Sequence, residues 1–309
     1  MGMFDAIPRR YFPHLAILAV VAFGTTWGIA AKTAVGTMPV TDFLFIRYVL
    51  ATALIAIPLL ARKHTRKPGR CERQAFVLGF FDPGATTLFV FYALYYTDAV
   101  NAIIIAAWLP LLAAIAAWWL IGERPSLPAV AGAALALIGI VLLVSDDAAQ
   151  LKSDSLIGDL LCIACQVTLA GSVALMRRIN QEAGDPLSVA AWQIAGGTVT
   201  VAVASVIDSL IAGRPWLSMP PVEGWLLVCY LALFLTVGSF WLYNYALRYL
   251  PTARVTLYGL ISPPLAVPLT AAVLGESVTW IDASALAVVL AGVALPILIA
   301  VRRSAPPAP

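Results

Sequence analysis

The chain has 309 residues, of which 61% are hydrophobic and only 11% are charged, and its formal net charge is +3. A soluble domain has about 25% charged residues, so this composition excludes an ordinary soluble protein. Most side chains must therefore contact lipid or other parts of the protein.

Long apolar segments, separated by short polar gaps, follow one another along the whole sequence. A membrane-spanning helix needs about 20 predominantly apolar residues, and the sequence contains ten runs of roughly this length. In chain order they are 13–35, 40–61, 75–97, 99–121, 127–145, 157–178, 187–212, 224–249, 252–274 and 280–301. We predict an all-α integral membrane protein with ten transmembrane helices.

Lysine and arginine are unevenly divided between the two sides that ten alternating helices define. Fifteen of the nineteen fall on the side of both termini, and only Lys152 and Arg214 fall on the other side. Cytoplasmic loops carry the excess of positive residues, so we expect both termini in the cytoplasm and the chain in the cell inner (plasma) membrane. This rule explains the basic segment 62–70 better than a nucleic-acid patch or a dedicated anionic-lipid site does, and no nucleic-acid partner is expected.

The two halves of the sequence resemble each other at an offset of 153 residues. The aligned elements are Tyr92-Ala93-Leu94-x-Tyr96 with Tyr245-Ala246-Leu247-x-Tyr249, Pro110 with Pro263, and Gly122-Glu123 with Gly275-Glu276. Each half, 13–145 or 157–301, contains five predicted helices. Because five is odd, the second half enters the membrane from the opposite side, as in many secondary transporters. The prediction is two inverted five-helix repeats.

These motifs resemble the drug/metabolite transporter superfamily, in its EamA branch. The segments Trp27-Gly28 and Phe45–Ala51 are also similar to the signature of the first repeat. The resemblance implies a transporter or exporter of small metabolites, and similar members include YddG-type exporters of amino acids, among them aromatic ones. The same branch is associated with other metabolites and drugs.

Ionisable residues inside a membrane are rare and usually functional. Asp82 lies about one third of the way into a predicted span and is followed by Pro83-Gly84, a triplet that should break the helix. The alternative is a structural kink with Asp82 as a cap. Arg47 is predicted to hold a substrate carboxylate, with a purely structural partner as the equal alternative.

Aromatic and polar residues at helical spacing predict the rest of an amphipathic cavity, with ordinary interhelical hydrogen bonding as the alternative. The complete predicted substrate-binding set is Thr26, Trp27, Arg47, Asp82, Trp108, Gln166, Tyr243, Tyr258 and Ser262. Other tryptophans fit interfacial belts, namely Trp118, Trp119, Trp216, Trp225 and Trp280.

We therefore predict a secondary transporter that works by alternating access at a midplane cavity, with amino acids as the favoured substrates. The alternatives are export of other metabolites or drugs, nucleoside-like or cationic, and less plausibly a channel. The sequence contains neither a phosphate-binding loop nor a catalytic or metal-ligand constellation, so we expect no ATP-driven pump, no enzyme and no cofactor. The expected partners are a small-molecule substrate and the lipid bilayer, and a monomer suffices for this mechanism.

Overall fold

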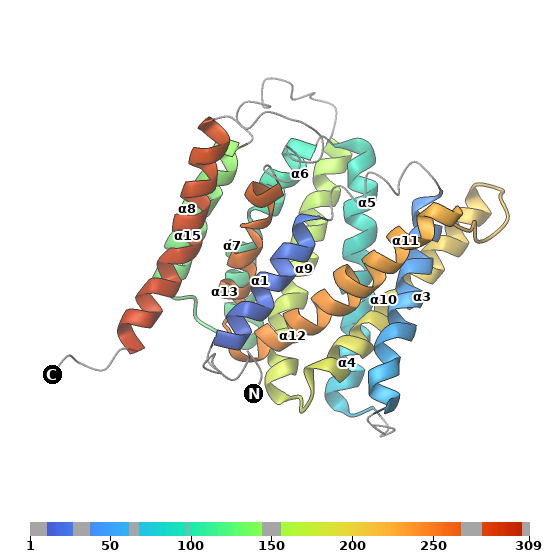
Figure 1. Ribbon diagram of the computed structural model, residues 1–309, viewed down its shortest axis with the longest axis horizontal. Helices are drawn as coiled ribbons and strands as arrows, with labels where there is room; N and C mark the ends of the chain where they lie inside the picture. The colour runs from blue at the N-terminus through green and yellow to red at the C-terminus, as the bar shows by residue number, and fades with distance from the viewer. Residues whose placement is uncertain are drawn as a thin grey trace. The chain divides into compact units, whose positions relative to one another are not determined.

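The computed structural model describes residues 11–26, 38–61, 68–97, 99–143, 156–266 and 280–304. Within these ranges the secondary structure is helical and contains no strand (Figure 1). Six described helical segments are long and apolar enough to cross a membrane: Val40–Ala61, Arg70–Ala93, Ala102–Ile121, Leu156–Glu182, Pro186–Ile211 and Gly224–Tyr249. Three shorter apolar helices are Phe12–Thr25, Leu127–Leu142 and Ala283–Pro296. The all-helical class is confirmed, whereas ten spans and the inversion remain predictions.

The chain forms two compact units. Unit 1 comprises Met1–Phe91 and Leu175–Leu250, and unit 2 comprises Tyr92–Ala174 and Pro251–Pro309. Each unit thus combines residues from both predicted repeats.

Most helices belong to a single unit. Those of unit 1 are α1 (Phe12–Thr25), α3 (Val40–Ala61), α4 (Arg70–Gly79), η2 (Phe80–Ala85), α10 (Pro186–Ile211), α11 (Val222–Tyr230), η4 (Leu231–Gly238) and α12 (Ser239–Tyr249). Those of unit 2 are α6 (Ala99–Ala106), α7 (Leu109–Ile121), α8 (Leu127–Leu143), α13 (Thr252–Gly259) and α15 (Trp280–Ser304). Helices α5 (Thr86–Tyr96) and α9 (Leu156–Glu182) contain the boundaries between the units.

Helix bounds recur at the same offset as the sequence motifs. Helices α5 and α12 begin and end 153 residues apart, and so do α6 and α13. The π-helical segments η2 and η4, which immediately precede α5 and α12, also end at this offset. Proline fits the first turn of a helix, and Pro110 stands there in α7, directly after one of these breaks.

Helix α10 is the centre of unit 1, where it packs against α3, α4, η2 and α12 (Figure 1). Its contact with α4 is a backbone contact, because a Cβ atom on Gly79 would clash with the carbonyl of Gln193, and one on Gly196 would clash with the carbonyl of Phe76. Glycine therefore allows these two helices to approach more closely than any other residue would. Fully buried side chains around α3 and α10, such as Leu44 and Ile194, form the hydrophobic core of this unit.

In unit 2, α8 and α15 lie side by side along their length (Figure 1). Gly132 and Gly292 face each other across this contact, and a Cβ atom on either would clash with the backbone of the other helix. Gly139 likewise lies against Val289. Small residues are favoured where membrane helices pack closely, and these glycines form such a packing seam.

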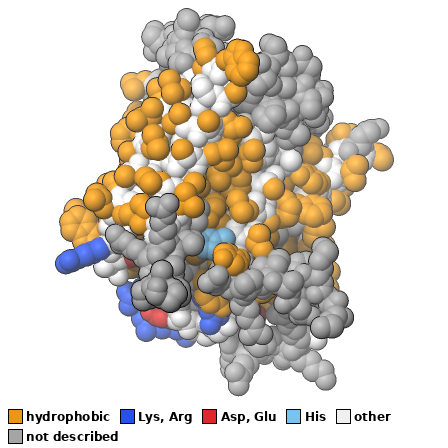
Figure 2. Space-filling model, turned by 60° about the vertical axis from the view of Figure 1, so that its left-hand side comes forward, with side chains coloured by type: hydrophobic (Ala, Val, Ile, Leu, Met, Phe, Trp, Pro, Cys, Tyr) orange, Lys and Arg blue, Asp and Glu red, His pale blue; other side chains and the backbone are white. Residues whose placement is uncertain are grey.

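Large apolar side chains cover much of the visible surface (Figure 2). The exposed apolar residues include Trp119, Ile211 and Leu226, each more than 80% exposed. Soluble monomers rarely show extended apolar surfaces, so this surface fits contact with lipid. The five tryptophans assigned to interfacial belts are all exposed.

Candidate transport site

Asp82 interrupts the helix that runs from α4 into α5. Its backbone has φ −134° and ψ 111°, an extended conformation inside η2. Pro83 has no backbone N–H to donate, and its ring lies against Gly197 of α10, where a Cβ atom would clash. Asp82 is only 9% exposed and accepts a hydrogen bond from the Thr86 hydroxyl at 3.1 Å. The predicted break of the helix is confirmed.

A chain of buried amide side chains leads to Asp82 from three other helices. Gln193 of α10 donates from Nε2 to the carbonyl oxygen of Asp82 at 3.0 Å and to its carboxylate at 3.2 Å. Asn244 of α12 donates to Oε1 of Gln193 at 2.9 Å, and Asn180 of α9 donates to Oδ1 of Asn244 at 2.5 Å. All three amide side chains are at most 3% exposed. Each amide donates toward Asp82, so the carboxylate is the acceptor at which the chain ends.

Arg47 of α3 is also buried, with 5% of its surface exposed. Its Nε donates to the hydroxyl of Thr236 in η4 at 2.9 Å. Its guanidinium lies 5.5 Å from the ring centre of Tyr48, whose hydroxyl is 2.9 Å from that of Thr87. In the part of the chain that the structure describes, Arg47 has no ion pair with an acidic side chain. A buried charged residue thus lies at each π-helical segment: Asp82 is part of η2, and Arg47 contacts η4 through Thr236.

The remaining predicted residues of unit 1 are Thr26, Tyr243 and Trp27. The Thr26 hydroxyl lies 2.7 Å from that of Tyr230 and donates to the carbonyl of Phe23 at 2.7 Å. Tyr243 is partly buried and directly precedes Asn244 in α12. Trp27 lies outside the described residues.

Four predicted residues lie in unit 2. Trp108 stands at the break between α6 and α7 and is 49% exposed. Gln166 of α9 is 8% exposed, and its Oε1 has no hydrogen-bond partner among the described residues. Tyr258 is 4% exposed near the end of α13, and Ser262 follows it, partly buried. The structure thus assigns the eight described candidates to two units, four to each.

Sequence reasoning did not select the amides Asn180, Gln193 and Asn244, or Thr236. Part of the signal was present, since Gln193 and Asn244 stand inside predominantly apolar runs, where polar side chains are costly without partners. Asn180 lies just beyond the end of the run 157–178. What the sequence does not show is that all three lie next to Asp82, which depends on how α9, α10 and α12 pack.

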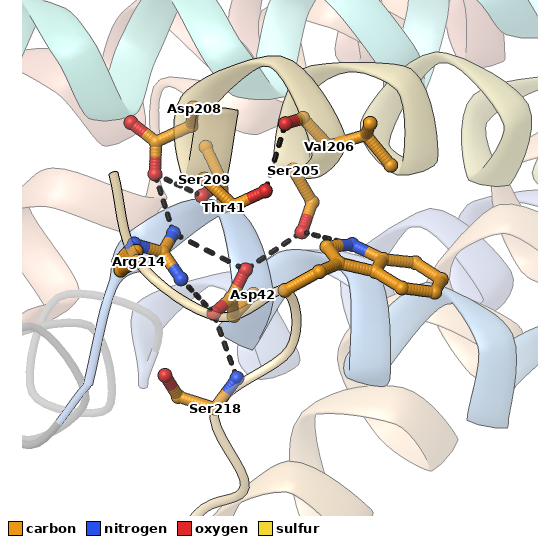
Figure 3. A network of polar contacts seen from close by, with 9 residues as sticks. Thr41, Asp42, Ser205, Val206, Asp208, Ser209, Arg214 and Ser218 are labelled. Carbon is orange, nitrogen blue, oxygen red and sulfur yellow. Dashed lines mark hydrogen bonds and ion pairs between the residues drawn. The ribbon is translucent and has the colours of Figure 1, made fainter. Parts of the chain in front are cut away.

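A second polar cluster lies where α3 begins and α10 ends (Figure 3). Asp42 is fully buried and accepts hydrogen bonds from the Ser205 hydroxyl at 2.6 Å, from the Ser218 backbone at 2.9 Å, and from Arg214 at 2.6 Å. Arg214 also bonds Asp208 at 2.6 Å, and Asp208 accepts from Thr41 at 2.8 Å. The hydrogen bonds from Arg214 to Asp42 and Asp208 raise the pKa of Arg214. Every oxygen of Asp42 has a partner, so this cluster fixes a loop and does not present an open binding site.

Among the described residues, no three His, Cys, Asp or Glu side chains gather at a position that could hold a metal ion. Cys162 and Cys165 are buried in α9, as small apolar packing residues commonly are.

The comparisons with known proteins agree with this architecture. Residues 12–145 and 156–298 match the EamA-like transporter family, and the chain belongs to this family. The uncharacterized transporter YyaM of Bacillus subtilis is 27% identical over 241 residues, which cover 76% of this chain and 77% of YyaM. The uncharacterized inner membrane transporter YedA of Escherichia coli K12 is 30% identical over 164 residues, about half of each chain.

One solved crystal structure has the same fold. It covers 95% of this chain and 99% of its own chain with a TM-score of 0.78, at 21% sequence identity.

These matches make the chain a multi-pass membrane protein that transports small molecules. Family and relatives indicate a transporter and not an enzyme.

Proposed function

We propose that the chain is a secondary transporter that exports small metabolites, most favourably amino acids including aromatic ones, by alternating access. In this proposal the repeats 13–145 and 157–301 are inverted, both termini lie in the cytoplasm, and the chain works in the inner membrane as a monomer. The recurrence of helix bounds at one offset supports the repeat, since inverted repeats with interrupted helices are typical of secondary transporters.

The observation that carries the proposal is the pair of buried charged groups at the two π-helical segments, Asp82 at the break in η2 and Arg47 against η4. Interrupted helices mark substrate sites in many transporters, and charged groups inside the membrane mark substrate or proton pathways. Arg47 uses one donor for Thr236, and its guanidinium has five N–H donors in all, so the others are suited to a carboxylate. Asp82 is suited to the amino group or to a transported proton.

A panel transport assay tests the proposal. The purified protein, reconstituted in liposomes, is tested with radiolabelled alanine, tryptophan, a nucleoside and an organic cation, both for uptake and for counter-flow. We expect saturable counter-flow of amino acids, which the Arg47→Gln variant loses and the Arg124→Gln variant keeps. Transport of the nucleoside or the cation alone would assign the chain to another substrate class, and flux without saturation or counter-flow would indicate a channel.

A further inference from the structure

Helices α4 and α9 line an open groove within unit 1 that takes no part in the proposed transport site. Its volume is about 530 Å³, within the range of small-ligand sites. The lining residues are Arg70, Arg73, Gln74, Val77, Leu78, Leu175, Arg178, Ile179 and Glu182. Three are arginines and one is acidic, so the charge of the lining favours an anion.

The lining separates into a polar end and an apolar wall. Arg70 and Arg73 lie on the first turn of α4, while Val77 and Leu78 lie one to two turns further along the same helix. Val77 is 52% exposed, which leaves an apolar side chain facing open space in the groove. A ligand that matches both parts has an anionic head joined to a hydrocarbon body.

The arginines are available to such a ligand. Arg178 is paired with Glu182 at 3.1 Å, but both side chains are about half exposed, and exposed pairs of this kind contribute little. Arg73 donates from Nε to the carbonyl of Gly69 at 3.4 Å, a long contact. The two terminal nitrogens of its guanidinium can therefore still donate to a ligand. Arginine forks suit phosphate oxygens.

We propose that this groove binds an anionic phospholipid, with the phosphate held by Arg73 and Arg178 and the acyl chains lying along Val77, Leu78 and Leu175. A soluble phosphate would satisfy the arginines but would leave the apolar wall uncovered. The Arg70 end of α4 belongs to the side of the chain that we predict to be cytoplasmic, and basic pockets between membrane helices on that side bind anionic head groups. The inference concerns a site separate from transport, and binding can be measured whether or not the transport proposal holds.

Native mass spectrometry of the purified full chain tests this site with phosphatidylglycerol and phosphatidylcholine of identical acyl chains at equal concentration. We expect preferential retention of phosphatidylglycerol. The Arg73→Gln/Arg178→Gln variant should lower that retention about 25-fold, since each cation near an anionic surface contributes about 1 kcal/mol, or roughly a factor of five. Arg124→Gln, an exposed arginine outside the groove, should change nothing.

Equal retention of the two lipids by the native protein would overturn the proposal, and so would undiminished retention by the double variant. Glycerol 3-phosphate serves as the soluble competitor. Displacement of the lipid by millimolar competitor would show a site for free anions instead. If the double variant does not fold, the native comparison and Arg73→Gln alone decide the question.

Discussion

Gln193 holds Asp82 through a single amide nitrogen, which donates to its carbonyl oxygen at 3.0 Å and to its carboxylate at 3.2 Å. The broken backbone and the buried charge of η2 are thus stabilised by one side chain of α10. Because the same amide contacts both groups, a change in the charge of Asp82 alters the contact that holds the helix break.

This arrangement makes Asp82 a candidate for proton coupling, since a carboxyl in a site of low dielectric constant can take up and release a proton during transport. We expect Asp82→Asn to abolish uptake driven by a pH gradient while sparing counter-flow, which needs no net proton movement. Both activities are measured in the same liposomes. If both survive the substitution, Asp82 is a structural residue of the kink and the protein is a facilitator.

Asn244 connects Gln193 to Asn180 in the row of buried amides, and its contribution to the stability of the fold can be measured. Asn244→Leu leaves the Oε1 of Gln193 and the Nδ2 of Asn180 without this partner, and an unsatisfied buried polar group costs about 1–3 kcal/mol. We expect a lower midpoint of thermal unfolding in detergent. The matched control is Ser239→Ala on the same helix, because the hydroxyl of Ser239 donates a local hydrogen bond, to the carbonyl of Phe234 in the adjoining η4. An unchanged midpoint for Asn244→Leu would show that the hydrogen bonds among these buried amides do not stabilise the fold.

Arg214 is the one cation bonded to the fully buried Asp42 among the described residues. Removing one partner of a buried pair leaves an uncompensated charge and costs about 3–5 kcal/mol. Arg214→Gln should therefore destabilise the protein by this amount in thermal or denaturant unfolding. Arg178→Gln, which breaks an exposed pair, is the control and should cost below about 1 kcal/mol. Similar losses for both variants would contradict the assigned role of the cluster.

The predicted orientation can be tested with cysteine labelling. Cys71 is half-buried at the start of α4, and Met219 is 63% exposed in the loop after α10. In a background without the other cysteines, we expect an impermeant maleimide to label Met219→Cys in intact cells and Cys71 only after permeabilisation. The reverse pattern would place the termini outside and refute the orientation drawn from fifteen cations against two.

Trp108 tests whether an aromatic residue contributes to substrate choice. We expect Trp108→Ala to weaken transport of tryptophan more than that of alanine, because an indole offers apolar area that only the larger substrate covers. The half-saturation concentration for each substrate is the measurement. Trp119→Ala, at an 82% exposed position, is the control. Equal losses for the two substrates would show that Trp108 does not contribute to substrate choice.

The sequence predicted the elements of this fold better than their arrangement. Hydrophobic run lengths and the Asp82-Pro83-Gly84 triplet depend on local chemistry, so the helices and the break at η2 follow from them. The π-helical segment η4 carries no proline and was not predicted. The partners of Asp82 and Arg47 also escaped prediction, because Gln193 and Thr236 are distant in sequence and reach them only through packing.

The glycine contact between α4 and α10 has a mechanical consequence. Where Gly79 and Gly196 bring the two backbones together, no side chain lies between them that could change rotamer. Closely packed interiors transmit displacement instead of absorbing it. We therefore expect α4 and α10 to move together at this contact, which keeps Gln193 of α10 next to Asp82 of the adjoining η2.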